Sequence, residues 1–268
     1  PEEVVGKKVT VVANDVFKDP KPLTSFVGPD VTELGNYVFY GSRTVTNIVL
    51  SSALKSMGVC AAAYTYNTAN FYPTDMTNLT TYGSQALEGA FQSTTYAPTM
   101  KFPRLKSFKV FRSGIGCVIA TNMTDITEQA FWQCSRLTNV VVSANLKTVG
   151  ARAFEEAKAL KSFDLGEYPQ LTTIGASAFK KATALAGPMH LTATGLTAVP
   201  ASAFEGCSAL SGVSLGAQIT SVGDSAFAGL APSADIYFFG DPPTMGSKAL
   251  YAQDGESTDA RARMWVVG

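Results

Sequence analysis

Apolar and polar positions along the chain repeat with a period of about 23 residues. The unit is clearest in four segments that each contain an Ala-Phe pair: VGARAFEEAKALKSFDL from Val149, IGASAFKKATAL from Ile174, VPASAFEGCSALSGVSL from Val199 and VGDSAFAGL from Val222. A fixed period of this length is typical of stacked repeats, so it determines the architecture before any single element is considered.

The second residue of each Ala-Phe pair serves as an anchor from which each turn is counted. The anchors of the regular part are Phe131, Phe154, Phe179, Phe204 and Phe227, at intervals of 23 to 25 residues, and the series extends to Leu250, Leu87, Phe39, Phe17 and a weak anchor near Ala62. The 44 residues between Leu87 and Phe131 fit either two degenerate turns or one turn with insertions. The count is about ten turns, more than the three or so that stacking needs.

Each anchor is followed by apolar or small residues at positions +3, +6, +9 and +11. In the unit of Phe204 these residues are Cys207, Leu210, Val213 and Leu215. The alternation at +9 and +11 predicts a short strand with one buried face, and we expect a short helical or 3₁₀ stretch around the Ala-Phe pair.

One such unit is too small to bury its own apolar side, so neighbouring turns must cover it and share one core. The sequence therefore predicts a right-handed solenoid, mainly β with short helical or 3₁₀ segments, of about ten stacked turns. We expect one solenoid over residues 1–268: an N-terminal strand or cap (1–16), degenerate repeats with possible insertions (17–124), regular repeats (125–249) and a closing repeat (250–268) with a last strand from about Ala262 to Val267.

Two segments, VPASAFEGCSAL and ITEQAFWQCSRL, resemble the leucine-rich repeats of the BspA type, whose pattern is Ile-Gly-x-x-Ala-Phe-x-x-Cys-x-x-Leu. The resemblance is strong from about Asp125 to Gly246, moderate from about Val31 to Leu50, and weak elsewhere. It implies a leucine-rich-repeat fold in a secreted or surface-anchored bacterial protein, whose repeats bind host proteins, matrix or other cells without catalysis.

Composition and charge limit the classes of binding partner that we expect. The chain has 21 Lys plus Arg and 21 Asp plus Glu, hence no net charge, and only 16% charged residues, below the roughly 25% usual for soluble domains. We therefore expect no nucleic-acid partner. No apolar run approaches the roughly 20 residues of a membrane span, and Pro1-Glu2-Glu3 does not resemble a signal peptide. The expected location is extracellular or at the cell surface, with no leader in this chain.

The cysteines, carboxylates and glycines fit structural roles. Cys134 and Cys207 both occupy the small apolar +3 position, three turns or about 14 Å apart, too far for a disulfide, which needs about 7 Å. Cys60 and Cys117 are also expected to be unpaired. With one histidine and no close Cys pair, neither a metal site nor a cofactor is expected. The Glu155-Glu156 pair follows an anchor on a turn, as solvated acids do, so no catalytic residue is assigned, and the glycines are expected at repeat corners with positive φ.

The first candidate binding surface is the outward row of the strands, because extended solenoid faces bind ligands. Counting from the anchors gives Val27, Val49, Tyr72, Lys109, Val141, Asp164, His190, Ser214 and Tyr237, with Trp265 at the end. The mixed character of the row fits a protein partner better than a polyanion. From this row, Tyr72, Lys109, Asp164, His190 and Tyr237 are the candidate ligand-binding residues.

The second candidate is the aromatic segment YTYNTANFYPTDMTN. Its Tyr64, Tyr66 and Tyr72 offer flat amphipathic faces to a protein or to sugar rings, whereas Phe71 falls in the buried register. The alternative is that these tyrosines only patch a degenerate repeat.

These patterns predict a non-enzymatic binding or adhesion module for host or matrix proteins, and leave the ligand and the oligomeric state open. Two alternatives remain: a carbohydrate-recognising surface protein, and a structural spacer for an absent domain. A binding module should carry a localised apolar or aromatic patch, whereas a spacer should be uniformly polar.

Overall fold

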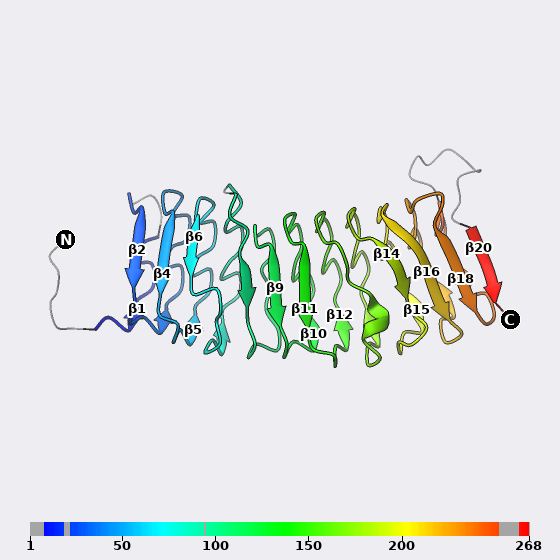
Figure 1. Cartoon of the computed structure of the whole chain (residues 1–268), viewed down its shortest axis with the longest axis horizontal. Helices are drawn as coiled ribbons and strands as arrows, with labels where there is room; N and C mark the ends of the chain where they lie inside the picture. Colours follow the sequence, from blue (N-terminus) through cyan, green and yellow to red (C-terminus); the bar gives the residue numbers. More distant parts are fainter. Residues whose placement is uncertain (1–7, 19–21, 94, 252–262, 268) are drawn as a thin grey trace.

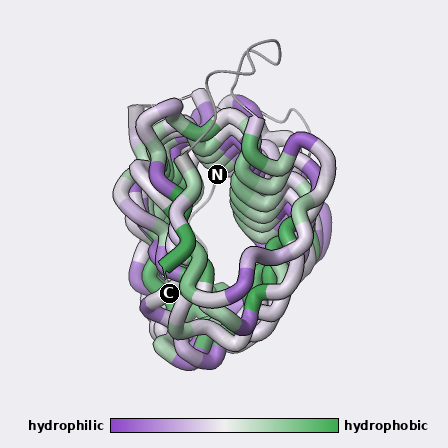
Figure 2. Tube along the Cα trace, turned by 90° about the vertical axis from the view of Figure 1, so that its right-hand side faces the viewer, coloured by the Kyte–Doolittle hydropathy of each residue, from purple (hydrophilic) through white to green (hydrophobic). Residues whose placement is uncertain are grey.

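The chain winds into a parallel β-solenoid of about ten turns, as predicted. The computed structural model describes residues 8–18, 22–93, 95–251 and 263–267. Figure 1 shows the turns side by side along one axis, and Figure 2, a view along that axis, shows them superposed on one closed outline. The remaining residues of the predicted N-terminal cap and closing repeat lie outside the described ones.

One side of the solenoid, here called the long-strand wall, is built from the strands predicted at positions +9 and +11. Its strands are β2 (Ser25–Gly28), β4 (Asn47–Leu50), β6 (Asn70–Tyr72), β8 (Thr99–Lys101), β9 (Cys117–Ala120), β11 (Asn139–Val142), β14 (Gly187–His190), β16 (Leu210–Gly216), β18 (Asp235–Phe239) and β20 (Arg263–Val267). They form three parallel sheets, β2–β4–β6, β8–β9–β11 and β14–β16–β18–β20, in which residues at equal positions in the repeat lie side by side, as Val213 does with Ile236.

A second side, the short-strand wall, is built from the apolar pair that precedes each anchor segment. Its strands are β1 (Val11–Val12), β3 (Glu33–Leu34), β5 (Ser56–Met57), β7 (Thr81–Tyr82), β10 (Asp125–Ile126), β12 (Thr148–Val149), β13 (Thr173–Ile174), β15 (Ala198–Val199), β17 (Ser221–Val222) and β19 (Thr244–Met245). These strands also pair in parallel, turn on turn.

The third side, the turn wall, contains the anchors. The prediction of a short helical or 3₁₀ stretch around them is wrong. The anchor backbone donates to the next turn: Phe131 N–H bonds the carbonyl of Ala153 at 2.8 Å, and Phe154 N–H bonds that of Ala178 at 2.7 Å. The residues two before and two after an anchor are left-handed, as at Gln129 (φ 58°) and Gln133 (φ 54°). These reversals direct the amides toward the neighbouring turn, which is incompatible with helical i→i−4 bonding.

The 3₁₀ helix η1 (Leu165–Glu167) lies on the long-strand wall, between β11 and β14, instead of on the turn wall. It stands where the repeat places a strand. Phe163 and Leu165 keep the buried positions there, so the core continues across this interruption of the sheet.

The 44 residues between Leu87 and Phe131 form two turns. Val110 occupies the anchor position of the added turn, because its N–H bonds the carbonyl of Ala130 at 2.8 Å, in the same pattern as Phe131 and Phe154. The anchor role of Ala62 is confirmed in the same way, by a 2.8 Å bond to the carbonyl of Ala86.

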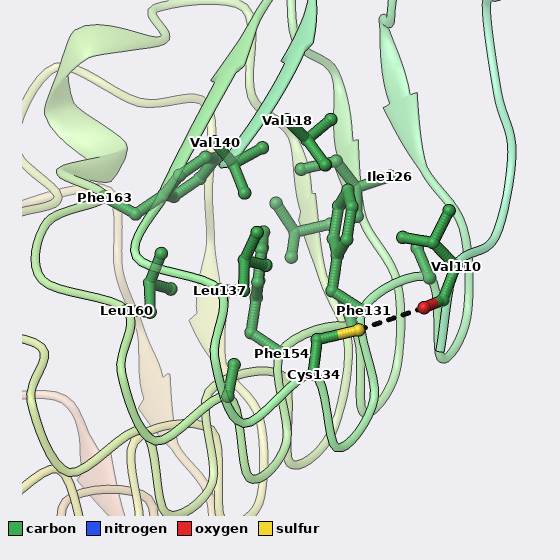
Figure 3. Packing of buried hydrophobic residues seen from close by; sticks show 14 of the residues in the cluster. Val110, Val118, Ile126, Phe131, Cys134, Leu137, Val140, Phe154, Leu160 and Phe163 are labelled. Atoms are coloured by element: carbon green, nitrogen blue, oxygen red, sulfur yellow. Dashed lines mark hydrogen bonds between the residues drawn. The ribbon is translucent and has the colours of Figure 1, made fainter. Parts of the chain in front are cut away.

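The anchor side chains form a ladder in the core. Seven of the proposed anchors are at most 1% exposed: Phe39, Leu87, Phe131, Phe154, Phe179, Phe204 and Phe227. From Phe131 to Phe227 successive rings stack with centroids 5.1 to 5.5 Å apart. Figure 3 shows the start of this ladder among the buried aliphatic side chains.

The glycines of the Ile-Gly pattern are required by close packing instead of by positive φ. A Cβ built on Gly175 would lie 2.2 Å from the backbone nitrogen of Ala151, and one on Gly150 would lie 2.4 Å from that of Glu128. The short-strand walls of adjacent turns approach too closely here for any side chain. Many of the left-handed positions are occupied by polar residues such as Gln129 and Ser177.

Candidate functional site

The structure divides the candidate aromatic segment between two walls. Tyr72 is the outward residue of β6 on the long-strand wall, where it pairs with Val49 and is 50% exposed. Tyr64 and Tyr66 lie two and four residues after the anchor Ala62, on the turn wall. Phe71 is buried, as predicted.

Tyr64 and Tyr66 are part of a larger group on the turn wall, which we call the tyrosine cluster: Tyr37, Tyr40, Tyr64 and Tyr66. Ring centroids are 5.6 Å apart for Tyr37 and Tyr40, 5.4 Å for Tyr40 and Tyr64, and 5.9 Å for Tyr64 and Tyr66. Tyr40 and Tyr64 meet edge to face at 90°, an arrangement that aromatic quadrupoles favour.

The sequence interpretation missed Tyr37 and Tyr40. The signal was present, because they lie two residues before and one after the anchor Phe39. Stacking the turn of Phe39 on the turn of Ala62 brings these positions beside Tyr64. Counting outward positions on the turn wall, as was done for the strands, would have found the cluster.

A buried carboxylate fixes the centre of the tyrosine cluster. The Tyr64 hydroxyl donates to Glu88 Oε1 at 2.6 Å, and Gln85 Nε2 donates to Glu88 Oε2 at 2.8 Å. Glu88 is only 4% exposed. Burial of Tyr64, together with its bond to Glu88, raises the pKa of the tyrosine far above its usual value, so the hydroxyl remains a donor even in alkaline solution.

Two cations border the tyrosine cluster. Lys18 Nζ lies 5.0 Å from the ring centroid of Tyr37, and the guanidinium carbon of Arg43 lies 5.8 Å from that of Tyr66. Both distances are within the range of cation–π attraction. Arg43 is exposed, so the edge of the cluster offers hydrogen-bond donors beside apolar ring surface.

On the long-strand wall, the outward row is as predicted except for Lys109. Lys109 directly precedes the anchor Val110 and lies outside the strands. Its place in the row is taken by Lys101 and Ile119, which pair with each other in β8 and β9. The prediction was wrong because the turn of Val110 lacks an Ala-Phe pair, which left the register of residues 88–124 open.

Asp164 and His190 are neighbours in this row, and they bridge the interruption at η1. Asp164 Oδ1 accepts the backbone N–H of Gly166 at 3.0 Å and that of His190 at 2.9 Å. Asp164 Oδ2 lies 2.6 Å from His190 Nδ1. The carboxylate thus replaces the strand-to-strand bonding that η1 removes, and this gives both residues a structural role.

Tyr237 lies at the C-terminal end of the outward row. It pairs with Trp265 of β20, whose indole Nε1 donates to Asp235 Oδ1 at 3.0 Å. Trp265 is 50% exposed. A second, smaller aromatic surface therefore lies on the long-strand wall, far along the solenoid from the tyrosine cluster (Figure 1).

The buried thiols are inert. Cys134 Sγ donates to the carbonyl of the anchor Val110 (Figure 3), and Cys207 Sγ donates to that of Phe179, each at 3.0 Å. Burial raises the pKa of both thiols to about 12. All four cysteines are free, and Cys134 and Cys207 are protonated at neutral pH.

The described part of the chain contains neither a cluster of metal-binding side chains nor a helix that could span a membrane. Within the described ranges, no three His, Cys, Asp or Glu side chains gather in a way that could hold a metal ion. Over the same residues, no helix has the length and apolar character needed to cross a membrane.

The parallel solenoid and its stacked phenylalanine ladder are those of a repeat scaffold, and this scaffold presents an aromatic surface on its outside. The profile of the BspA type leucine-rich repeat region matches residues 4–115 and 105–233 in 6 copies, so the chain belongs to this family. The family is generally a non-catalytic repeat scaffold of bacteria. A comparison with curated proteins gives no match.

Solved structures share the fold. A leucine-rich-repeat protein from Bacteroides ovatus superposes with a TM-score of 0.60 at 15% identity, over 97% of this chain and 88% of that one. A leucine-rich cell surface protein from Faecalibacterium prausnitzii gives 0.52 at 19% identity, over 87% of this chain and 65% of that one. At these identities the likeness concerns the fold.

Proposed function

We propose that this chain acts outside the cell as a non-enzymatic binding module that attaches to a host or matrix protein through the tyrosine cluster. The observation that carries the proposal is the gathering of Tyr37, Tyr40, Tyr64 and Tyr66 from two adjacent turns onto one place on the turn wall. A spacer needs no such patch, because a uniformly polar exterior serves it equally well.

The chemistry of the cluster suits a protein ligand. Tyrosine supplies a large contact area while losing little conformational freedom, which is why it is enriched at protein interfaces. Here Tyr64 is already held by Glu88 and by edge-to-face packing on Tyr40. The surface is therefore preorganised, which lowers the entropic cost of binding.

The extracellular location rests on the family. The solved relative from Faecalibacterium prausnitzii is described as a cell surface protein. We extend that location to this chain as part of the proposal.

Binding of the purified chain to immobilised matrix proteins, such as collagen and laminin, and to an array of neutral glycans tests the proposal. The informative variant is Tyr40→Ala/Tyr66→Ala, which removes two rings and leaves the Tyr64–Glu88 hydrogen bond intact. We expect saturable binding to at least one protein, weakened about tenfold or more in the variant, as for truncated interface aromatics.

The matched control is Tyr72→Ala/Tyr237→Ala, which removes two rings from the long-strand wall. It should bind like the wild type once equal thermal unfolding has been verified. Selective binding to the glycan array would favour the carbohydrate-recognising alternative, and no binding on either panel would favour the spacer.

A further inference from the structure

A groove follows the corner where the turn wall ends, on turns that contribute no ring to the tyrosine cluster. Two adjoining hollows form it and share Lys158 in their linings. The first hollow is lined mainly by hydroxyl, amide and guanidinium groups, including those of Ser135, Gln133 and Arg112. We call the two hollows together the corner groove.

Four successive turns each place one cation in the corner groove. Arg112 belongs to the turn of Val110, Arg136 to that of Phe131, Lys158 to that of Phe154 and Lys181 to that of Phe179. Because stacked rungs lie about 4.8 Å apart, the turns that carry these cations advance by about that distance along the solenoid axis.

The groove carries excess positive charge although the whole chain is neutral. Its carboxylates are Glu156, which lies 3.7 Å from Lys158 Nζ, and Glu205, which lies 2.8 Å from Lys180 Nζ. Burial alone would raise the pKa of Glu205, but hydrogen bonds from Lys180 and Ser202 and the charges of Lys180 and Lys181 lower it. Glu205 is thus ionised, and its close ion pair is with Lys180, while the groove cation Lys181 acts on it through charge alone.

Two of the four cations are held in place. Arg136 donates to the backbone carbonyls of Phe91 and Thr95 at 3.2 and 2.7 Å, contacts that fix a guanidinium without cancelling its charge. The guanidinium of Arg112 lies over the half-buried Trp132 ring, 5.8 Å from its centroid. Trp132 thus supports the first cation of the row from below.

We propose that the corner groove binds a linear acidic glycan, whose carboxylate or sulfate groups are met by one cation per turn from Arg112 to Lys181. Charge-assisted hydrogen bonds from guanidinium and ammonium groups are strong contacts for such anions. The hydroxyl and amide lining of the first hollow suits a hydroxyl-rich chain better than an acidic peptide. This site lies outside the tyrosine cluster and does not depend on the function proposed above.

The test measures binding of the full chain to heparin, polygalacturonate, dextran and polyglutamate, which are respectively sulfated, carboxylated, neutral and peptidic. Binding can be followed by tryptophan fluorescence in a Trp265→Phe background, which leaves Trp132 as the single tryptophan. The variant Arg112→Gln/Lys158→Gln/Lys181→Gln removes three of the four cations. We expect binding to at least one acidic glycan that falls with added salt and weakens about tenfold or more in this variant.

The matched control is Lys55→Gln/Lys106→Gln/Lys147→Gln. These exposed lysines each follow a buried leucine on another part of the repeat. Replacing them removes three positive charges, the same number as in the groove variant. The control should bind within about twofold of the wild type, since long-range charge alone is screened at physiological salt.

Preference for heparin or for polygalacturonate identifies sulfate or carboxylate as the recognised group, and either result supports the proposal. Three results would overturn it: no binding to either acidic glycan, equal weakening in both triple variants, or binding to polyglutamate as tight as to the glycans. Tyr40→Ala/Tyr66→Ala should leave glycan binding unchanged, so the corner groove and the tyrosine cluster can fail independently.

Discussion

The regular turns between residues 125 and 249 and the degenerate turns between residues 17 and 124 build the same solenoid from different cores. In the regular part, anchor rings from Phe131 to Phe227 stack with interplanar angles of 3 to 14°. In the degenerate part, three successive anchors are Ala62, Leu87 and Val110. The volume there is filled by rings from other positions, such as the Phe102–Phe108 pair.

The turn wall differs between the same two regions. In the regular part it presents charged residues that pair between turns, as Lys180 and Glu205 do at 2.8 Å. In the degenerate part it presents the tyrosine cluster (Tyr37, Tyr40, Tyr64 and Tyr66). Strict repetition thus produces a uniform core, whereas departures from the repeat coincide with an aromatic surface that a scaffold alone does not require.

The largest expected effect separates the two cores. Phe179→Ala removes a ring that stacks on both neighbours, and it should lower the free energy of unfolding by about 3–5 kcal/mol. Leu87→Ala, which lies next to the small anchor Ala62, should cost less, about 2–3 kcal/mol. Urea unfolding measures both values. Equal or inverted costs would show that the ring ladder adds no special stability to the regular turns.

The next effect tests close stacking of the short-strand wall. Gly175→Ala places a Cβ 2.2 Å from the backbone of Ala151 and should destabilise the fold by about 1–3 kcal/mol, as overpacking does. The comparison is Gly195→Ala, whose Cβ would lie 3.0 Å from the side-chain methyl group of Thr172. It should cost less than about 1 kcal/mol, because a side chain moves aside more easily than backbone. If both changes cost the same, the stacking argument fails.

The buried thiols predict a loss of stability at alkaline pH. In the folded chain the pKa of Cys134 and of Cys207 is raised from 9.0 to about 12. Below pH 9 both states hold the proton and stability is complete. Between pH 9 and 12 the unfolded chain ionises while the folded chain does not, so stability falls, by about 1 kcal/mol per thiol at pH 10.

The measurement is the change in unfolding free energy from pH 8 to pH 10, compared with that of Cys134→Ala/Cys207→Ala. Tyrosine ionisation affects both proteins and cancels in the comparison. An identical pH dependence would mean that the thiols are not shielded as the structure shows.

The smallest expected effect concerns the tyrosine cluster. Tyr40→Ala/Tyr66→Ala should change the unfolding free energy by less than about 1 kcal/mol, because both rings are partly exposed and outside the core. Thermal and urea unfolding give the value. A loss as large as that of Phe179→Ala would mean that the cluster patches a degenerate core instead of serving a ligand.

The sequence predicted what repetition determines: the anchor series, the strands at +9 and +11, the buried thiols and most of the outward row. The predictions failed where the structure depends on contacts between adjacent turns, which the local sequence does not show. Lys109 was misplaced because the turn of Val110 lacks an Ala-Phe pair. The anchor segments appeared helical because local spacing does not show that their amides bond to the next turn. Tyr37 and Tyr40 were missed because only the strand positions were traced outward.

The most direct test of the central claim compares two matched double variants on one matrix-protein ligand identified by the binding panel. Dissociation constants are measured for the wild type, for Tyr40→Ala/Tyr66→Ala on the turn wall, and for Tyr72→Ala/Tyr237→Ala on the long-strand wall. The account predicts binding weakened about tenfold or more in the first variant and unchanged in the second. Loss of binding only in the second would place the ligand on the long-strand wall and contradict the assignment of function to the tyrosine cluster.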